Sequence, residues 1–166
     1  HGTAVPHREY LEDGITMHEI SSEALPKVDF EAVRRIENSG KILKNYGAYL
    51  TDESKLSHQG AQDLFFPTTE AELSAIFREM AARHIQVTLS AARTGIVGGA
   101  VPYGGAIVSL EGFDKVLGLR YDRSAKEWRV RAECAVTLRD LNTWAMKKTF
   151  PLHRGGVSAE ADQAFQ

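Results

Sequence analysis

A glycine-rich segment between two strand-like runs is the most informative part of this sequence. Five of the 14 glycines lie between residues 95 and 105. Residues 85–89 and 106–110 flank this segment and are mainly apolar and β-branched, which is typical of strands. Glycine has no Cβ, so such a segment lets several backbone N–H groups approach a phosphate. From glycine content alone, a flexible crossover loop is an equally good interpretation.

The residues before the glycine-rich segment predict a strand followed by a helix. Residues 63–66 form a short apolar run that Pro67 stops, which indicates a strand. Thr69 and Glu72 have the spacing of a capping box, and apolar side chains recur at helical spacing over residues 73–81. We therefore expect a capped amphipathic helix between the first two strands.

The residues after the segment predict a hairpin and a last helix. Residues 116–121 and 127–133 have the pattern of two strand arms joined by a polar turn. Thr137 is placed to cap a helix that carries Leu138 and Leu141. The order is strand, helix, strand, glycine-rich loop, strand, hairpin and helix, which indicates a mixed α/β (α+β) fold.

The N-terminal part is less regular. The first 25 residues show no clear period and indicate an arm. A helix is expected to begin at Asp29, which can serve as its N-cap. Its apolar stripe would consist of Val33, Ile36, Ile42 and Leu43.

Composition excludes several classes of protein. The formal net charge is −2, which argues against nucleic acid as the main partner. There is one cysteine, Cys134, so no disulfide within the chain is expected. No apolar run is long enough to cross a bilayer, and no histidine has a metal-site spacing with another ligand. A cytoplasmic protein that is not transmembrane and has no metal site is the default expectation.

The side chains of residues 90–99 favour phosphate chemistry. Ser90 and Thr94 supply hydroxyl donors, and Arg93 supplies a positive charge. The segment does not have the G-x-G-x-x-G pattern of a Rossmann site, and it does not have the pattern of a P-loop.

Four segments, in this order and spacing, resemble a known family. They are Tyr49–Ser54, residues 64–73, residues 90–102 and residues 132–142. Together they resemble the entry segment, the strand-to-helix step, the pyrophosphate loop and the last-helix step of PCMH-type FAD-binding domains. This family includes vanillyl-alcohol oxidase, p-cresol methylhydroxylase, glycolate oxidase and D-lactate dehydrogenase. The resemblance implies a two-subdomain α/β domain that binds FAD.

The resemblance also assigns roles to individual residues. Pro67 would end the first strand near the adenosine portion of FAD, and Gly98 and Gly99 would let the loop approach the cofactor. The residues implied to wrap the pyrophosphate are Ser90, Ala91, Ala92, Arg93, Thr94 and Gly95.

Some positions depart from the family pattern. Ala91, Ala92 and Ala135 stand where the family usually has glycine, and Cys134 stands where it often has proline. Thr94 stands where some relatives have the histidine that attaches flavin covalently, so the resemblance implies noncovalent FAD.

The resemblance implies that the sequence is an N-terminal piece of a larger enzyme. Residues 1–45 would be an arm and helix, residues 46–152 the first part of the FAD-binding domain, and residues 153–166 its truncated continuation. The family's second glycine-rich stretch and its substrate domain do not follow, so no catalytic residue is assigned. The intact protein would be an FAD-linked oxidase or dehydrogenase that moves a hydride from a lactate-like or glycolate-like 2-hydroxy acid to the flavin. The piece alone is expected to be inactive.

Two alternatives stay open. The chain could be a non-catalytic flavin-half module that needs a partner chain, and an unfinished sheet could then support a homo-oligomer. It could instead be a general binder of nucleotide phosphates, in which case ADP would compete as well as FAD.

Overall fold

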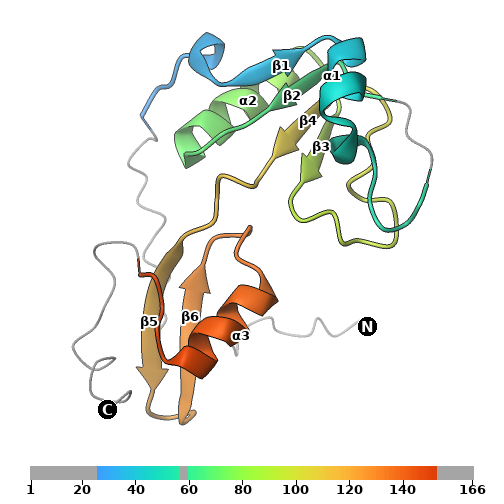
Figure 1. Cartoon of the computed structure of the whole chain (residues 1–166). Helices are drawn as coiled ribbons and strands as arrows, with labels where there is room; N and C mark the ends of the chain where they lie inside the picture. The colour runs from blue at the N-terminus through green and yellow to red at the C-terminus, as the bar shows by residue number, and fades with distance from the viewer. Residues whose placement is uncertain (1–25, 57–59, 153–166) are drawn as a thin grey trace, which may run out of the picture.

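The computed structural model describes residues 26–56 and 60–152 (Figure 1). Its main sheet has four strands in the order β1-β2-β4-β3. β1 pairs antiparallel with β2, whereas β2, β4 and β3 run parallel to one another. The strand bounds are Arg35–Glu37 for β1, Asp63–Phe65 for β2, Val87–Ser90 for β3 and Ala106–Ser109 for β4.

Helices cover both faces of this sheet, and the strand alternation explains why. Phe65 of β2 and Val108 of β4 pack with Ile76 and Met80 of the helix α2 (Glu70–Ala82). The intervening side chains of the same strands point to the opposite face, because successive residues of a strand alternate between faces. There Leu64 and Ile107 pack in a second cluster, together with Ile42, Leu50 and Ala61. Ile42 and Leu50 come from helix α1 (Ser39–Asn45) and the 3-10 helix η2 (Gly47–Leu50).

The predicted helix α2 and its capping box are confirmed. The Thr69 hydroxyl accepts a hydrogen bond from the Glu72 amide at 3.2 Å. The Glu72 carboxylate in turn accepts from the amides of Thr68 at 2.6 Å and Thr69 at 3.2 Å. The Glu72 carboxylate therefore places a negative charge at the positive N-terminal end of α2.

The predicted long helix beginning at Asp29 is wrong. Asp29 caps only the single 3-10 turn η1 (Phe30–Ala32), accepting a hydrogen bond from the Glu31 amide at 3.0 Å. The chain then extends as β1 and pairs with β2, and Asn38, with φ of 81°, separates β1 from α1. Pairing with β2 satisfies backbone groups of β1, and such tertiary context overrides the local helical spacing. The arm expected over residues 1–25 lies outside the described residues.

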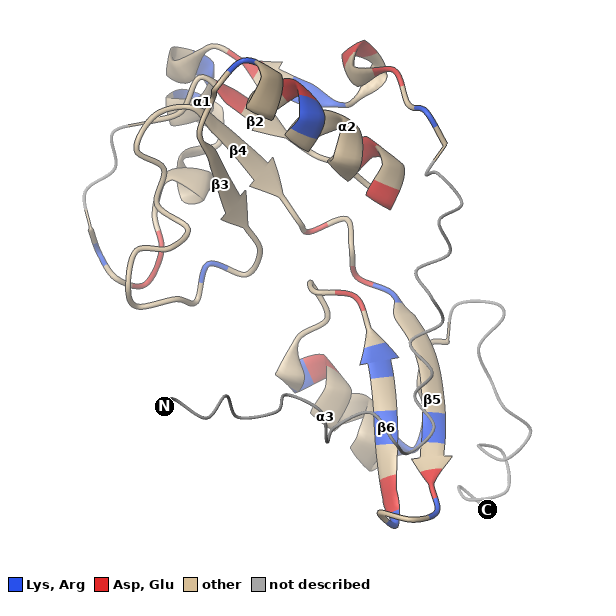
Figure 2. Ribbon diagram, turned by 180° about the vertical axis from the view of Figure 1, so that it is seen from behind, with Lys and Arg blue, Asp and Glu red and all other residues tan. Residues whose placement is uncertain are grey.

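The predicted hairpin and last helix are confirmed. Strands β5 (Val116–Asp122) and β6 (Glu127–Ala132) pair antiparallel, and α3 (Leu138–Lys147) follows with Thr137 as its N-cap. Figures 1 and 2 show this unit apart from the four-stranded sheet, joined to it by the chain that leaves β4. We refer to the described residues up to Ser109 as the sheet lobe and to residues 116–152 as the hairpin lobe. No helix in the described ranges has the length and apolarity needed to span a membrane.

Candidate cofactor site

The carboxyl ends of three parallel strands meet at one edge of the sheet lobe. β3 ends at Ser90, where the glycine-rich loop begins, and β2 and β4 end near Pro67 and Glu111. Ligands of open α/β sheets bind outside this edge, because the loops there can converge without blocking the strands. The predicted loop and Pro67 are therefore brought to the same edge.

The loop presents a run of free backbone donors. Within the part of the chain that the structure describes, the amides of residues 91–99 donate no hydrogen bond. The neighbouring amides are engaged, since Ala100 donates to Asp52 at 3.4 Å and Val101 to the Gly98 carbonyl at 3.1 Å. Backbone N–H groups that no acceptor satisfies are the groups that a diphosphate needs. The residues present therefore fit an anionic cofactor.

The entry segment noted in the sequence braces this loop. The Glu53 amide donates to the Arg93 carbonyl at 3.3 Å, and the Asp52 carboxylate accepts from the amides of Ser54 at 2.9 Å and Ala100 at 3.4 Å. The hydrogen bond from the Ser54 hydroxyl holds the pKa of Asp52 below its usual value. Two segments far apart in the chain thus define the loop's shape together, since Asp52 and Ala100 are 48 residues apart.

The loop needs glycine at position 98, whereas at position 99 the protein itself leaves room for a side chain. Gly98 has φ of 78°, and an added Cβ would meet the Cδ1 atom of Leu56. Gly99 has no atom within 4 Å of an added Cβ. Ala91 and Ala92 are not among the residues with positive φ, so their methyl groups cause no backbone strain. The left-handed conformation falls on Arg93 instead, at φ of 54°.

The Arg93 side chain folds back onto the sheet edge. Its Nη1 atom donates to the Ser90 hydroxyl at 3.3 Å, the Ala91 carbonyl at 3.0 Å and the Glu111 carboxylate at 2.9 Å. The guanidinium also lies 4.5 Å from the centre of the Tyr49 ring, and the Tyr49 hydroxyl donates to Glu111 at 2.6 Å. We call Tyr49, Arg93 and Glu111 the Arg93 network. The Glu111 carboxylate balances the charge of Arg93. The hydrogen bonds of the Arg93 side chain therefore fix the start of the loop against the sheet edge.

The network also sets the protonation of its members. Partial burial pushes the pKa of Glu111 upward, but the hydrogen bonds from Tyr49 and Arg93 outweigh it and leave that pKa below its usual value. Burial and the bond to Glu111 raise the pKa of Tyr49. At neutral pH Glu111 is therefore an anion and Tyr49 a neutral donor.

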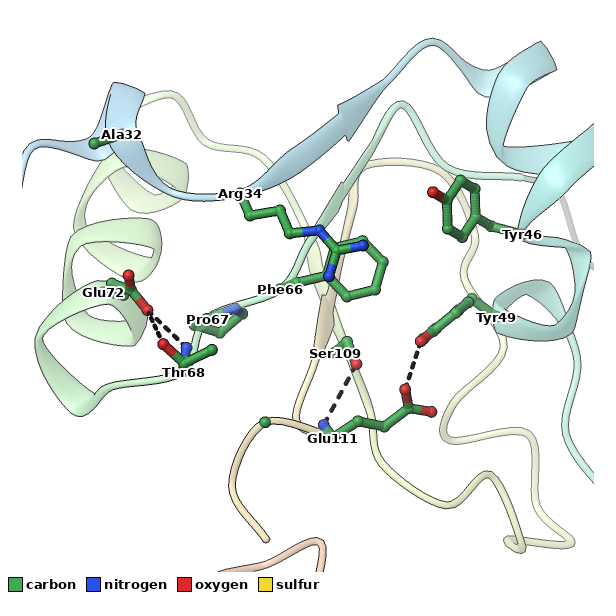
Figure 3. Close-up of a pocket in the computed structure, with 11 residues that line it drawn as sticks. Ala32, Arg34, Tyr46, Tyr49, Phe66, Pro67, Thr68, Glu72, Ser109 and Glu111 are labelled. Atoms are coloured by element: carbon green, nitrogen blue, oxygen red, sulfur yellow. Dashed lines mark hydrogen bonds between the residues drawn. The ribbon is translucent and has the colours of Figure 1, made fainter.

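A cavity of about 560 Å³ lies beside the network (Figure 3). Arg34 crosses it, and its guanidinium carbon is 4.4 Å from the centre of the Phe66 ring. The amides of Thr68 and Thr69 nearby donate to Glu72, so these two donors are already engaged. The cavity is lined by Ala32, Arg34, Tyr46, Tyr49, Phe66, Pro67, Thr68, Glu72, Ser109, Glu111 and Gly112.

The structure brings the predicted site residues into two adjoining parts. Residues 90–99 form the loop, with Ser90 fully buried at its start, while Pro67 lines the cavity. Glu111 connects the two parts, because it binds Arg93 of the loop and also lines the cavity. Sequence reasoning missed Glu111, although its place directly after a buried strand at the ligand edge was an available signal. Arg34 was also not predicted to line the cavity, because it fell within the helix expected from Asp29. Among the described residues, no group of three or more His, Cys, Asp and Glu could hold a metal ion.

Comparison with known proteins identifies the family of this chain. Residues 61–158 match a family model described as an FAD binding domain. The D-lactate dehydrogenase of Anaerostipes hadrus is 39% identical over 82 residues, which is 49% of this chain and 16% of that protein. The chain thus spans about a sixth of the length of this curated relative.

Solved structures of Physcomitrella patens BBE-like 1 are also similar. The wild-type structure has 15% identity and a TM-score of 0.43, covering 60% of this chain and 22% of that one. A variant of it has 17% identity and a TM-score of 0.40, covering 57% and 20%. The family model covers more than half of the chain. The chain therefore belongs to the FAD binding domain family, and FAD is the cofactor of that domain.

Proposed function

We propose that the loop of residues 90–99 holds the diphosphate of FAD. The observation that carries the proposal is the run of unsatisfied amides at the carboxyl edge of the sheet lobe. Backbone donors on a loop braced by Asp52 and Arg93 lose little entropy when an anion binds, because the loop is already shaped. The residues proposed to contact FAD are Pro67, Ser90, Ala91, Ala92, Arg93, Thr94, Gly95, Gly98 and Gly99.

Each part of the loop has its own proposed task. Amides of residues 91–99 donate to phosphate oxygens, and the exposed Thr94 hydroxyl adds a side-chain donor. Gly99 gives the diphosphate room to approach, since the space beside its Cα is open. Arg93 acts mainly by holding the loop's shape through Glu111. Thr94 has no nucleophilic ring nitrogen, so the cofactor is held without a covalent bond.

For the whole protein we propose an FAD-linked oxidoreductase that acts on a 2-hydroxy acid. The support is the identity to a D-lactate dehydrogenase over 82 residues. In such enzymes the bound flavin supplies the redox chemistry, and the protein supplies binding and orientation. The described residues contribute the binding of the cofactor's phosphate and adenosine ends.

The loop proposal is tested by titrating the chain with FAD and following flavin fluorescence. The wild-type chain should bind FAD, and Gly99→Ala should weaken FAD binding about tenfold while thermal stability stays unchanged. The reason is that an added Cβ at Gly99 meets nothing in the protein and can meet only the cofactor. Gly47→Ala is the matched control, because an added Cβ there also meets nothing within 4 Å but lies outside the loop. Equal FAD affinity of wild type and Gly99→Ala would contradict the proposed site.

A second candidate is a flavin-half module that functions with a partner chain. The exposed apolar side chains of α3 favour it, since Leu138 is 79% and Met146 is 87% exposed. Sedimentation of the purified chain tests it. A concentration-dependent dimer would support this candidate, and a monomer at all concentrations would oppose it.

A further inference from the structure

Among the described residues, Arg34 has no ionic partner, whereas Arg35 and Arg93 do. Arg35 pairs with Glu31 and with Glu37, each at 2.7 Å, and Arg93 pairs with Glu111 at 2.9 Å. In the described ranges, the Arg34 guanidinium makes no ion pair or hydrogen bond, and it lies over the Phe66 ring. Its donors are therefore free.

Phe66 rather than an anion positions the Arg34 guanidinium. A guanidinium over an aromatic face gains cation–π energy and presents its own plane to a further ring. Figure 3 shows the Arg34 side chain reaching across Phe66 at the wall of the cavity. The pair is thus a flat, positively charged surface beside about 560 Å³ of open volume.

The rest of the cavity favours a planar, neutral group over a second anion. Tyr46 and Tyr49 supply aromatic walls, and Glu111 supplies a negative charge. A free phosphate would meet the carboxylates of both Glu72 and Glu111, whereas an aromatic heterocycle can stack on Arg34 without that repulsion. The cavity adjoins the loop through Glu111, so one ligand can place its phosphates on the loop and its ring in the cavity.

We propose that Arg34 and Phe66 form a stacking platform for the adenine ring of FAD and make the site prefer flavin dinucleotide over flavin mononucleotide. This proposal rests on the proposed function, because the ring reaches the platform only if the diphosphate lies on residues 90–99. Arg34 precedes residues 61–158, so the family match does not assign it any role.

The test measures the affinities of wild type, Arg34→Ala and Arg34→Lys for FAD, ADP, FMN and inorganic pyrophosphate. FAD and ADP contain adenine, whereas FMN and pyrophosphate do not. Arg34→Ala should weaken FAD and ADP about tenfold and leave FMN and pyrophosphate within about twofold. Arg34→Lys keeps the charge but loses the plane, so it should weaken FAD and ADP nearly as much.

Arg35→Ala is the matched control. It removes the next arginine in the chain, whose partners Glu31 and Glu37 lie outside the cavity lining, so all four affinities should stay at the wild-type values. Thermal melting of each variant confirms that folding is retained.

Two results would overturn the platform. One is FAD affinity unchanged in Arg34→Ala. The other is an equal loss for pyrophosphate and ADP, which would assign Arg34 to phosphate charge. Failure of the wild-type chain to bind any of the four ligands would instead overturn the proposed function, and the platform with it.

Discussion

The sheet lobe and the hairpin lobe differ in how completely they bury their apolar side chains. All four residues of β4 are buried, and α2 buries Ala71, Ile76 and Met80 against the sheet. α3 of the hairpin lobe buries none of its residues, and Met146 is 87% exposed. The cofactor loop is attached to the lobe that packs on its own, and this packing holds its donors in place.

The largest expected effect is the difference in stability cost between a leucine-to-alanine substitution in the sheet lobe and one in the hairpin lobe. Leu64→Ala removes a fully buried side chain from the sheet lobe and should cost about 2–5 kcal/mol of unfolding free energy. Leu138→Ala removes a side chain that is 79% exposed and should cost less than about 0.5 kcal/mol. Urea denaturation followed by circular dichroism measures both values. Similar costs for the two variants would mean that the lobes do not differ in packing as described.

Backbone strain in the loop should give the next largest effect. Gly98→Ala places a methyl group at φ of 78° and against Leu56, so it should destabilise the sheet lobe by about 1–3 kcal/mol. Both tryptophans, Trp128 and Trp144, lie in the hairpin lobe, so their fluorescence reports on that lobe. The emission of the folded variant should match that of wild type. A shifted emission would show that loop strain reaches the hairpin lobe.

The Arg93 network should contribute a smaller amount. Tyr49→Phe removes the donor to Glu111 and should cost about 1 kcal/mol. It should also speed exchange of the Glu53, Ala100 and Val101 amides, whose hydrogen bonds hold the loop. Tyr46→Phe is the control, because the Tyr46 side chain makes ring contacts and its hydroxyl has no hydrogen bond within the described chain. Hydrogen exchange with mass spectrometry measures both variants. If Tyr46→Phe speeds exchange as much as Tyr49→Phe, the network does not hold the loop.

The smallest effect concerns the hairpin turn. Hydrogen bonds from the Ser124 hydroxyl and the Ala125 amide, with the charge of Arg129, lower the pKa of Asp122 to about 2. A carboxyl whose pKa is lowered by folding stabilises the fold above its unfolded value of 3.8, and this contribution is lost as pH falls toward 2. Tryptophan fluorescence should therefore change between pH 4 and 2 in wild type, as Asp122 titrates. Asp122→Asn should flatten this change, and an unaltered profile would rule Asp122 out as its source.

Local signals in the sequence were enough for most of the fold. The apolar run before Pro67, the Thr69–Glu72 capping box and the Thr137 cap depend on neighbours within a few residues, and each appears as expected. β1 was missed because its pairing with β2 joins residues far apart in the chain, and its own spacing also suits a helix.

Local sequence signals likewise predict the position of the candidate site but not its detailed geometry. The loop could be located from its glycines and its flanking strands. Its shape could not, because it depends on Asp52 and Glu111, which reach the loop from distant segments. The family usually has glycine at Ala91 and Ala92, but neither has a positive φ, and the left-handed backbone lies at Arg93. Contacts across the sheet edge decide these details, and a linear pattern does not contain them.

Hydrogen exchange of the chain with and without FAD tests the central proposal most directly. The free amides of residues 91–99 should become protected when FAD binds, because phosphate oxygens would accept their hydrogen bonds. The hairpin turn at residues 123–126 serves as the internal reference and should exchange at the same rate in both samples. Binding of FAD without protection of residues 91–99 would contradict the assignment of this loop to the diphosphate.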